Sequence, residues 1–371
     1  MSKTLQDYAT LINDTIQSNE INHYITTDNM CQNLGGIDTF KNINIPQGKV
    51  RSFQKDDVLL SNIRLYFRKV YRAKQKGGCS SDVLVFRAKH IDSATLFAIL
   101  SSQIFTDYAC SGSQGSKMPR GNKTHMMDFK IPTINFTIAK IFNSIQNKIE
   151  NNHKINELLH KILELLYEQY FVRFDFLDEN NKPYQTSGGK MKFSKELNRL
   201  IPNDFEVKTL GELIQLKVGN KNANHSSNQG KYPFFTCSNN PLRCETYQFE
   251  GKHIIISGNG NFYVTHYDGK FDAYQRTYVV NPNNQNHYVL IYLFVKSYTN
   301  YLKLQSHGSI IKFITKSDIE NIKIVLPNLK TYAKWNNVLK MIENNNQSTQ
   351  TLTALRDFLL PLLLKQQVKP Q

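Results

Sequence analysis

The chain has 371 residues, of which 40% are hydrophobic and 20% charged, and its formal net charge is +16. This length predicts more than one domain, and the positive charge favours a polyanionic partner such as nucleic acid, with a membrane surface as the competing partner. No stretch approaches about 18 uninterrupted apolar residues and the N-terminal sequence lacks signal-peptide features, so we expect a cytoplasmic protein with no membrane association.

The five cysteines and ten histidines are scattered along the chain. They show neither the C-x-x-C pairing nor the H-E-x-x-H spacing that is typical of zinc sites. We therefore expect reduced thiols and no bound metal.

The first half of the chain begins with a globular unit at residues 1–134 that carries two basic segments. Between Leu60 and Ser80 the basic residues are interleaved with aromatic ones, and a second basic loop, SGSQGSKMPRGNKTH, spans residues 111–125. Such segments can neutralise phosphates while arginines reach base edges, although a solvated basic face is the simpler alternative for any one residue. The predicted DNA-binding residues here are Arg64, Arg68, Lys69, Arg72, Lys74, Lys117, Arg120 and Lys123.

A long helix is predicted at residues 135–172, and a similar one at 329–366, followed by a tail at 367–371. Each has an apolar heptad seam interrupted by polar residues, which favours pairing of the two helices as an antiparallel coiled coil with a buried asparagine fixing the register. The alternative is that each seam packs on its own globular unit. The predicted seam and docking positions are Ile141, Ile145, Asn152, Ile155, Leu159, Ile162, Val338, Ile342, Asn345, Leu352 and Leu359.

A turn-rich connector at residues 173–205 leads to a second globular unit at 206–328. This unit contains Gly258-Asn259-Gly260 after a β-branched run, an order that also begins nucleotide-binding loops. The residues that follow alternate as in a strand, and the third glycine of G-x-G-x-x-G is replaced by Tyr263, so strand, turn, strand is predicted instead of a cofactor loop. The predicted DNA-binding residues of this unit are Lys231, Arg243, Asn259, Lys270, Tyr274, Gln275, Arg276, His307 and Lys312.

The second unit repeats the first. The matching strings are KTLQDYATLIN (3–13) with KTLGELIQLKVGN (208–220), KDDVLLSN (55–62) with KHIIISGN (252–259), and FKIPTI (129–134) with IKIVLP (322–327). The predicted fold class is therefore α+β, with two similar α/β-mixed domains, two long helices and a pseudo-two-fold internal repeat.

Catalytic motifs are not evident. Asn240-Pro241-Leu242-Arg243 lacks the second proline and the aromatic residue of an adenine methyltransferase motif, and no phosphate-binding loop of the Walker type occurs. Glu206-Val207-Lys208 has a nuclease-like spacing without a suitable upstream carboxylate. We expect a non-catalytic chain, with a self-contained methyltransferase or nuclease as the remote alternatives.

Four segments resemble the specificity subunit of type I restriction-modification systems: the connector FDFLDENNKPYQTSGGKMKFSKELNRLIPNDFEVKTLGEL, the loop IIISGNGNFYVTHYDGKFDAYQRTYVV, the segment DDVLLSNIRLYFRKVYRAKQKGGCSSDVLVFRAK, and LTALRDFLLPLLL. The resemblance implies two target-recognition domains that each bind one half of a bipartite double-stranded DNA site. It implies helices that dock two methyltransferase (modification) subunits, and restriction/translocase subunits in the full complex.

The same resemblance implies that adenine N6-methylation and restriction belong to the partner subunits. S-adenosylmethionine, ATP and Mg would be bound there, and no cofactor by this chain. The expected setting is phage defence in a prokaryotic cytoplasm. An orphan DNA-recognition subunit, or one from a type IIB-like or other defence system, is the alternative.

Overall fold

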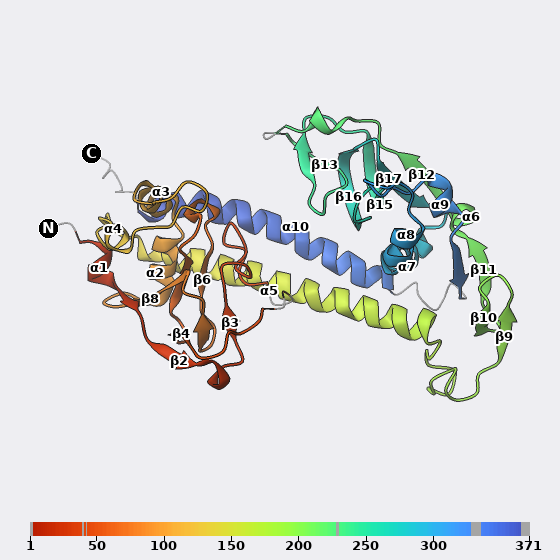
Figure 1. Ribbon diagram of the computed structural model, residues 1–371, viewed down its shortest axis with the longest axis horizontal. Helices are drawn as coiled ribbons and strands as arrows, with labels where there is room; N and C mark the ends of the chain where they lie inside the picture. Colours follow the sequence, from red (N-terminus) through yellow and green to blue (C-terminus); the bar gives the residue numbers. More distant parts are fainter. Residues whose placement is uncertain (1–2, 39–40, 42, 228–229, 328–334, 365–371) are drawn as a thin grey trace. The chain divides into compact units, whose positions relative to one another are not determined.

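A computed structural model describes residues 3–38, 41, 43–227, 230–327 and 335–364 (Figure 1). The chain divides into two compact units, called here unit 1 (Met1–Lys154 with Asn346–Gln371) and unit 2 (Ile155–Asn345). Within the described ranges, no helix combines the length and the apolar content that crossing a membrane requires.

Unit 1 is built on two small sheets. The first has the order β1-β8-β5-β6 and is antiparallel throughout; the second has the order β2-β4-β7-β3 and pairs β3 with β7 in parallel. The strands are β1 (Ala9–Ile12), β2 (Thr15–Gln17), β3 (Tyr24–Ile25), β4 (Lys49–Phe53), β5 (Val58–Ser61), β6 (Val70–Arg72), β7 (Gly77–Cys79) and β8 (Val83–Ala88). The short helices are α1 (Leu5–Tyr8), α2 (Ser93–Leu100), α3 (Gln103–Ser111) and α4 (Lys123–Met127), with 3-10 turns η1 (Ser18–Glu20) and η2 (Leu65–Phe67).

The core of unit 1 lies between the first sheet, the helices α2 and α3, and the start of the long helix α5 (Phe136–Tyr167). Asp92 caps α2 by accepting a hydrogen bond from the Thr95 backbone, and the helix is buried from Thr95 to Leu100. Phe97 packs on Phe142 of α5, with their ring centroids 5.5 Å apart. Burial of such aromatic and aliphatic side chains is the main favourable contribution to the stability of the unit.

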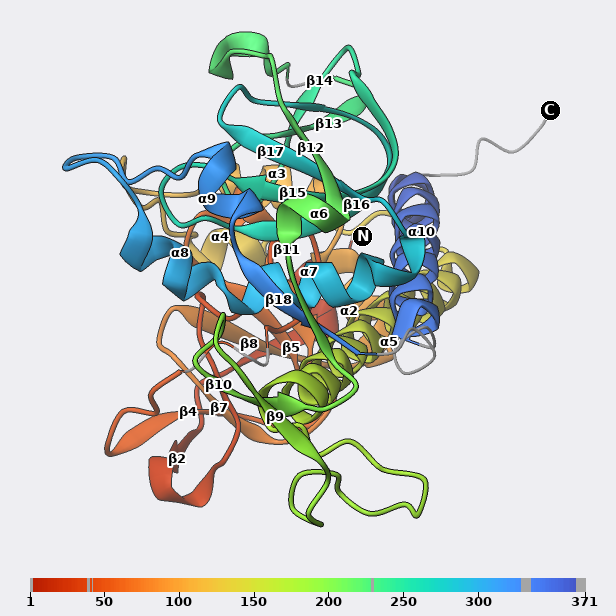
Figure 2. The same cartoon turned by 90° about the vertical axis from the view of Figure 1, so that its right-hand side faces the viewer.

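Unit 2 contains a six-stranded sheet with the order β12-β17-β15-β16-β13-β14 (Figure 2). A hairpin of β9 and β10 and a pair of β11 and β18 accompany it. The strands are β9 (Met191–Ser194), β10 (Arg199–Pro202), β11 (Glu206–Thr209), β12 (Ile214–Val218), β13 (Tyr232–Phe235), β14 (Leu242–Cys244), β15 (Phe249–Ser257), β16 (Val264–Ala273), β17 (Thr277–Pro282) and β18 (Lys323–Leu326). The helices are α6 (Leu210–Leu213), α7 (Tyr288–Ser297), α8 (Thr299–Gln305) and α9 (Lys316–Glu320), with 3-10 turns η4 (Ala223–His225) and η5 (Gln285–His287).

The predicted internal repeat is confirmed by the strand order. β12-β17-β15-β16 in unit 2 matches β1-β8-β5-β6 in unit 1. The long strand β16 corresponds to β6 and β7 together, so the parallel pair of β13 with the end of β16 matches that of β3 with β7. Even the capping agrees, because Thr4 with Asp7 and Thr209 with Glu212 form equivalent capping boxes on α1 and α6. The two units are therefore copies of one mixed α/β domain.

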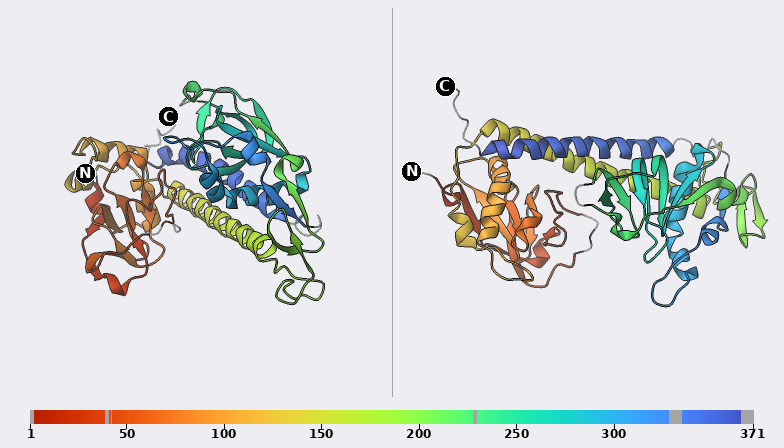
Figure 3. Two further views of the ribbon diagram at one scale, coloured as in Figure 1. Left: turned by 45° about the vertical axis from the view of Figure 1, so that its right-hand side comes forward. Right: turned by 90° about the horizontal axis from the view of Figure 1, so that it is seen from above.

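The predicted antiparallel helix pair is confirmed in both units. α5 continues into a π-helical turn, η3 (Glu168–Val172), and its partner α10 (Trp335–Leu359) ends in the 3-10 turn η7 (Leu360–Leu363) (Figure 3). In unit 1, Arg356 contacts Gln146 and Asn152 donates to Thr349 Oγ1 at 3.1 Å. In unit 2, Asn345 donates to Asn156 Oδ1 at 3.0 Å. The residue numbers of the α10 partners decrease as those of the α5 residues increase, as antiparallel pairing requires.

The predicted heptad seam is wrong at three positions of α5. Ile141, Ile155 and Ile162 are 43%, 40% and 46% exposed. The other three predicted seam positions of α5 are covered: Ile145 and Asn152 are buried, and Leu159 is half-buried. On α10, Ile342 is buried and Val338, Asn345, Leu352 and Leu359 are half-buried.

The residues that directly follow those three isoleucines, Phe142, Asn156 and Leu163, are buried. Each lies one residue after a position of the predicted seam. Because α5 carries apolar side chains on both adjacent rows, periodicity alone does not separate them. Packing of Phe142 into the core of unit 1 and of Leu163 into the core of unit 2 decides which row faces inward.

Candidate nucleic-acid interface

Two basic segments of unit 1 that are distant in sequence are hydrogen-bonded to each other. The Arg64 backbone N–H donates to Pro119 O at 2.9 Å, and the Gly121 N–H donates to Asn62 O at 3.2 Å. Residues 62–64, which follow β5, therefore lie beside residues 119–121, which follow α3. We call this pair of loops the unit 1 loop pair.

Unit 2 repeats this arrangement. The Gly260 N–H donates to Lys312 O at 2.9 Å, and the Ile314 N–H donates to Gly258 O at 2.9 Å. The turn after β15 is therefore held beside the loop between α8 and α9, and we call these the unit 2 loop pair. The turn after β16 joins them, since Gly258 N–H donates to Arg276 O at 2.7 Å.

The predicted basic residues of unit 1 fall into two groups. Lys117, Arg120 and Lys123 are exposed, and Arg120 is paired with Asp82 at 3.0 Å while its side chain stays 61% exposed. Arg64 is half-buried, with its guanidinium 6.0 Å from the centre of the Phe67 ring. These four lie in or next to the loop pair, where a polyanion could reach them.

The other four make contacts within the unit. Arg68 donates to Ser101 O at 2.9 Å, and burial lowers its pKa. Lys69 donates to Thr27 O, Arg72 lies 3.7 Å from Asp56, and Lys74 lies 3.3 Å from Glu150. Arg64 and Arg68 flank the 3-10 turn η2 with left-handed φ values of 50° each, and their side chains have different surroundings.

In unit 2, Gln275, Arg276, His307 and Lys312 are exposed, and they come from the segments that meet at the loop pair. Tyr274 and Asn259 are half-buried there, and Asn259 Oδ1 is buried without a hydrogen-bond partner among the described residues. His307 Nε2 lies 3.2 Å from Asp318 Oδ2. These residues offer cationic and amide groups suited to phosphates and base edges.

Three further predicted residues of unit 2 lie on or beside strands β13, β14 and β16. Lys231 and Arg243 are exposed on the β13–β14 hairpin, where Arg243 donates to Gly230 O at 2.9 Å and to Lys231 O at 3.1 Å. Lys270 on β16 lies over the Tyr247 ring at 4.6 Å and 3.8 Å from Glu250. Their contacts lie among strands β13 to β16 and the segments beside them, and the structure does not bring these three residues together with the unit 2 loop pair.

The turn at Gly258-Asn259-Gly260 joins two strands, β15 and β16, as the sequence predicted. A strand, β16, follows it instead of the helix that a phosphate-binding loop needs. A Cβ on Gly258 would lie 2.5 Å from Arg276 O, and Gly260 has a left-handed φ of +74°. Glycines therefore allow two loops to approach closely at this point.

Sequence reasoning missed Asn62, Asp82 and Pro119, which position the basic side chains of unit 1. The internal repeat aligns Asn62 with Asn259, which was predicted to bind DNA, so the alignment could have identified Asn62 as a candidate. Pro119 and Asp82 carried none, because only the tertiary fold brings them to Arg64 and Arg120.

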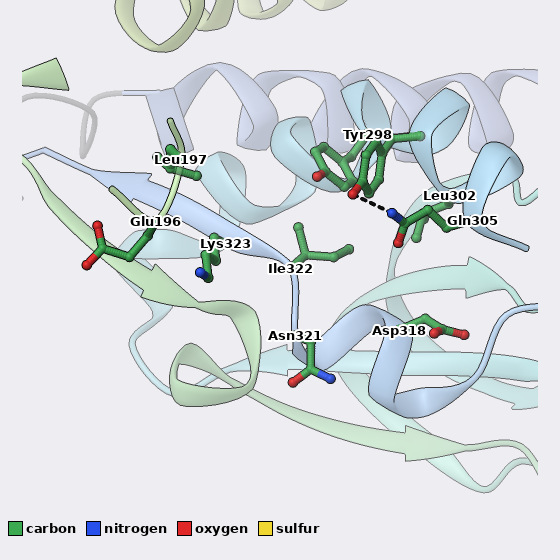
Figure 4. Close-up of a pocket in the computed structure, with 10 residues that line it drawn as sticks. Glu196, Leu197, Tyr298, Leu302, Gln305, Asp318, Asn321, Ile322 and Lys323 are labelled. Carbon is green, nitrogen blue, oxygen red and sulfur yellow. Dashed lines mark hydrogen bonds between the residues drawn. The ribbon is translucent and has the colours of Figure 1, made fainter. Parts of the chain in front are cut away.

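A cavity of about 500 Å³ lies in unit 2 beside the loop between α8 and α9 (Figure 4). Its carboxylates are Glu196 and Asp318. Hydrogen bonds from its own backbone and from Ser194 lower the pKa of Glu196. Burial alone would raise the pKa of Asp318, but hydrogen bonds from Thr315 and the nearby His307 lower it. Neither carboxyl group has the raised pKa that suits a general acid.

Comparisons with known proteins agree with this geometry. Residues 202–355 match the family described as the type I restriction modification DNA specificity domain. The EcoDI specificity subunit of Escherichia coli is 38% identical over 130 residues, which are 34% of this chain and 28% of that protein. The MjaIX specificity subunit of Methanocaldococcus jannaschii is 24% identical over 301 residues, which are 72% of this chain and 67% of that protein.

The fold is also similar to a crystal structure of a type I restriction-modification S subunit from M. genitalium. The TM-score is 0.63 at 16% identity, with 99% of this chain and 96% of that chain covered. The two repeated domains and the helix pair are therefore the fold that the two chains share. Residues 202–355 thus match the DNA specificity domain of type I restriction-modification systems, and the chain is similar to specificity subunits of those systems.

Proposed function

We propose that this chain is the non-catalytic DNA-specificity subunit of a type I restriction-modification complex. Each unit binds one half of a bipartite double-stranded DNA site. The helices dock modification subunits, which bind S-adenosylmethionine and methylate adenine. Restriction/translocase subunits use ATP and Mg in the complete assembly.

The observation that carries DNA recognition is the equivalent loop pair in each unit. Exposed basic residues gather there, Lys117, Arg120 and Lys123 in unit 1 and Arg276 and Lys312 in unit 2. A net charge of +16 adds a long-range attraction for a polyanion. The residues differ between the two loop pairs, so two different half-sites are expected from one repeated scaffold.

The observation that supports docking is an exposed apolar row on α5. Ile155, Leu158, Ile162 and Leu165 are 40%, 63%, 46% and 54% exposed and recur at intervals of three and four residues. That spacing places them on one face of the helix. Contiguous exposed apolar surface of this kind is typical of protein interfaces, and this row is the proposed contact with a modification subunit.

DNA binding is tested with the purified chain and a duplex by fluorescence anisotropy over a range of salt concentrations. We expect the double variant Lys117→Glu/Lys123→Glu to bind more weakly and to reduce the slope of log K against log salt by about 1 for each phosphate that is no longer neutralised. The control is Lys182→Glu/Lys192→Glu, which makes the same change of charge at exposed positions of the connector. An equal decrease in affinity in both double variants would show only a general charge effect and would refute the assignment to the loop pair.

Docking is tested by co-purification with a type I modification subunit that is expressed together with this chain. Leu158→Asp/Ile162→Asp should abolish the complex and leave DNA binding by the free chain unchanged, because both side chains are already exposed. Phe193→Asp is the control, since Phe193 on β9 is 59% exposed and lies outside the helix pair. A complex that survives the helix variant would remove this row from the proposed interface.

A further inference from the structure

Three potential metal ligands meet beside the outer strands of the six-stranded sheet in unit 2. His225 ends η4, Cys244 ends β14, and Asp272 lies near the end of β16. Their ligand atoms all lie within 4.8 Å of one another, and His225 Nε2 is 3.1 Å from Asp272 Oδ2. Cys244 and Asp272 are buried, and His225 is half-buried.

Asp272 is incompletely satisfied by the described part of the protein. Its side chain is 0% exposed. Oδ2 accepts a hydrogen bond from Thr246 Oγ1 at 2.7 Å and faces His225, whereas Oδ1 is buried without a hydrogen-bond partner. A buried carboxylate oxygen that is left unpaired is strongly unfavourable. A further positively charged or hydrogen-bonding partner at Oδ1 would therefore stabilise this carboxylate.

The internal repeat shows that the fold itself does not require this carboxylate. Asp272 pairs with Phe234 between the parallel strands β16 and β13. The equivalent pair in unit 1 is Gly78 with Tyr24, so a glycine occupies the matching position. The buried acid therefore belongs to a feature that unit 2 has and unit 1 lacks.

We propose that His225, Cys244 and Asp272 bind a zinc ion, with Thr246 Oγ1 or a water as the fourth ligand. Imidazole nitrogen, thiolate sulfur and carboxylate oxygen are the donors that zinc prefers in four-coordinate sites. In a tetrahedral site the ligand atoms lie about 3.3–3.8 Å apart, so the widest gap must close by about 1 Å. On binding, the Cys244 thiol loses its proton to solvent and the sulfur bonds to the metal.

The polar contacts of the cysteine favour the thiol in the absence of a metal. Cys244 Sγ faces the acceptors Thr246 O at 3.2 Å, Tyr232 O at 3.6 Å and Pro233 O at 3.8 Å, so the charge of the bound ion has to offset the loss of the thiol proton. His225 Nε2 also lies 3.0 Å from Thr246 Oγ1. Thr246 thus contacts all three proposed ligands, which makes its hydroxyl a suitable fourth donor. The sequence predicted no metal because the three residues are widely separated along the chain.

The ion would fasten the outer hairpin to the sheet. β13 pairs with β16 through only two residue pairs, Phe234 with Asp272 and Phe235 with Ala273. β14 in turn pairs only with β13 among the described strands. A metal joining β14, η4 and β16 would hold the hairpin that carries Arg243. This structural site does not depend on the proposed DNA binding.

Metal content is the first test. The full chain is produced with zinc in the medium, dialysed without chelator, and analysed by inductively coupled plasma mass spectrometry. We expect about one zinc per chain in the wild type, and near-background zinc in Cys244→Ser and Asp272→Asn. Cys237→Ser is the matched control and should keep its zinc, because Cys237 Sγ contacts Arg276 O and lies outside the cluster.

Two further measurements keep the test independent of whether a variant folds. Cobalt added to the metal-free wild type and Cys237→Ser should give a thiolate-to-cobalt charge-transfer band that Cys244→Ser lacks. A chelator should lower the thermal midpoint of wild-type unit 2, followed by the fluorescence of Trp335, and zinc should restore it. Wild-type zinc below about a tenth per chain, or zinc retained in Cys244→Ser, would overturn the proposal in favour of a water at Asp272.

Discussion

Gly258 and Gly260 have different roles in one turn, and substitution should separate them. A Cβ on Gly258 would lie 2.5 Å from Arg276 O, which is backbone and cannot move away easily, whereas a Cβ on Gly260 would meet nothing within 4 Å. We expect Gly258→Ala to destabilise unit 2 by about 2 kcal/mol or more through overpacking, and Gly260→Ala by about 1 kcal/mol through its left-handed φ.

Urea unfolding of unit 2 measures the difference, with the fluorescence of Trp335 as the signal. Trp335 is the only tryptophan of the chain and is buried in the core of unit 2. An equal or larger loss of stability in Gly260→Ala would mean that the turn relaxes around Gly258.

His266 predicts a loss of stability of unit 2 in mild acid. Burial, followed by the charges of His160, Lys252 and Lys296, lowers its pKa from 6.5 to about 3. Glu343 lies 3.6 Å from its Nδ1 and opposes this shift, but Lys252 shares the same carboxylate oxygen at 3.1 Å. The folded unit therefore holds His266 neutral, and its pKa is depressed relative to the unfolded chain.

Because the unfolded chain takes up a proton near pH 6.5, stability is fully present above that pH and falls as pH drops toward 3. Between pH 7.5 and pH 5 the loss of stability from this group is about 2 kcal/mol. Urea midpoints of unit 2 at the two pH values test this. His266→Gln should show a smaller loss between them, and His90→Gln, at an exposed position, should behave as the wild type.

At the scale of elements, the helix pair is stabilised by a polar contact inside unit 2. Asn345 donates to Asn156 Oδ1 at 3.0 Å, and Asn156 donates to Ile342 O at 3.3 Å. Asn156→Leu alone leaves the Asn345 amide without this acceptor and should destabilise unit 2 by about 1–3 kcal/mol. Replacing both residues by leucine removes the Asn345 amide together with its acceptor. The stability of the double variant should therefore be closer to that of the wild type than the stability of the single variant is.

A double-mutant cycle on urea unfolding, again with Trp335 fluorescence, measures this coupling. Additive effects of Asn156→Leu and Asn345→Leu would show that the two amides contribute independently. The double variant is also expected to lose helix register, because a buried asparagine pair is the feature that fixes it. Disulfide trapping between facing cysteines introduced on α5 and α10 reports the register.

At the scale of the whole molecule, the repeat predicts independent recognition by the two units. Each has its own sheet, core and loop pair, and the loop pairs are held by hydrogen bonds within one unit. Replacing residues 206–328 with the matching region of another specificity subunit should therefore change one half of the methylated sequence. Methylome sequencing of cells that also express the modification subunit tests this. A change in both halves would contradict independent recognition by the two units.

The sequence by itself determined the elements and their duplication. Capping boxes at Thr4 and Thr209, β-branched runs such as Ile254–Ile256 and the heptad patterns are local features, so similar strings produced the same short helices, strands and long helices in both units. The basic loops were visible for the same reason, since composition and charge need no tertiary information.

Only the tertiary structure decided which of these residues meet. On α5, Ile141 and Phe142 belong to two adjacent apolar rows. Phe142 is the buried one because it packs on Phe97 in the core of unit 1. In the sequence, Arg68 and Lys74 are as plausible DNA-binding residues as Lys117. In the structure, Arg68 contacts Ser101 and Lys74 contacts Glu150. His225, Cys244 and Asp272 came together through the pairing of β13 with β14 and β16. Such pairings depend on the free energy of the whole sheet, which no short window of sequence contains.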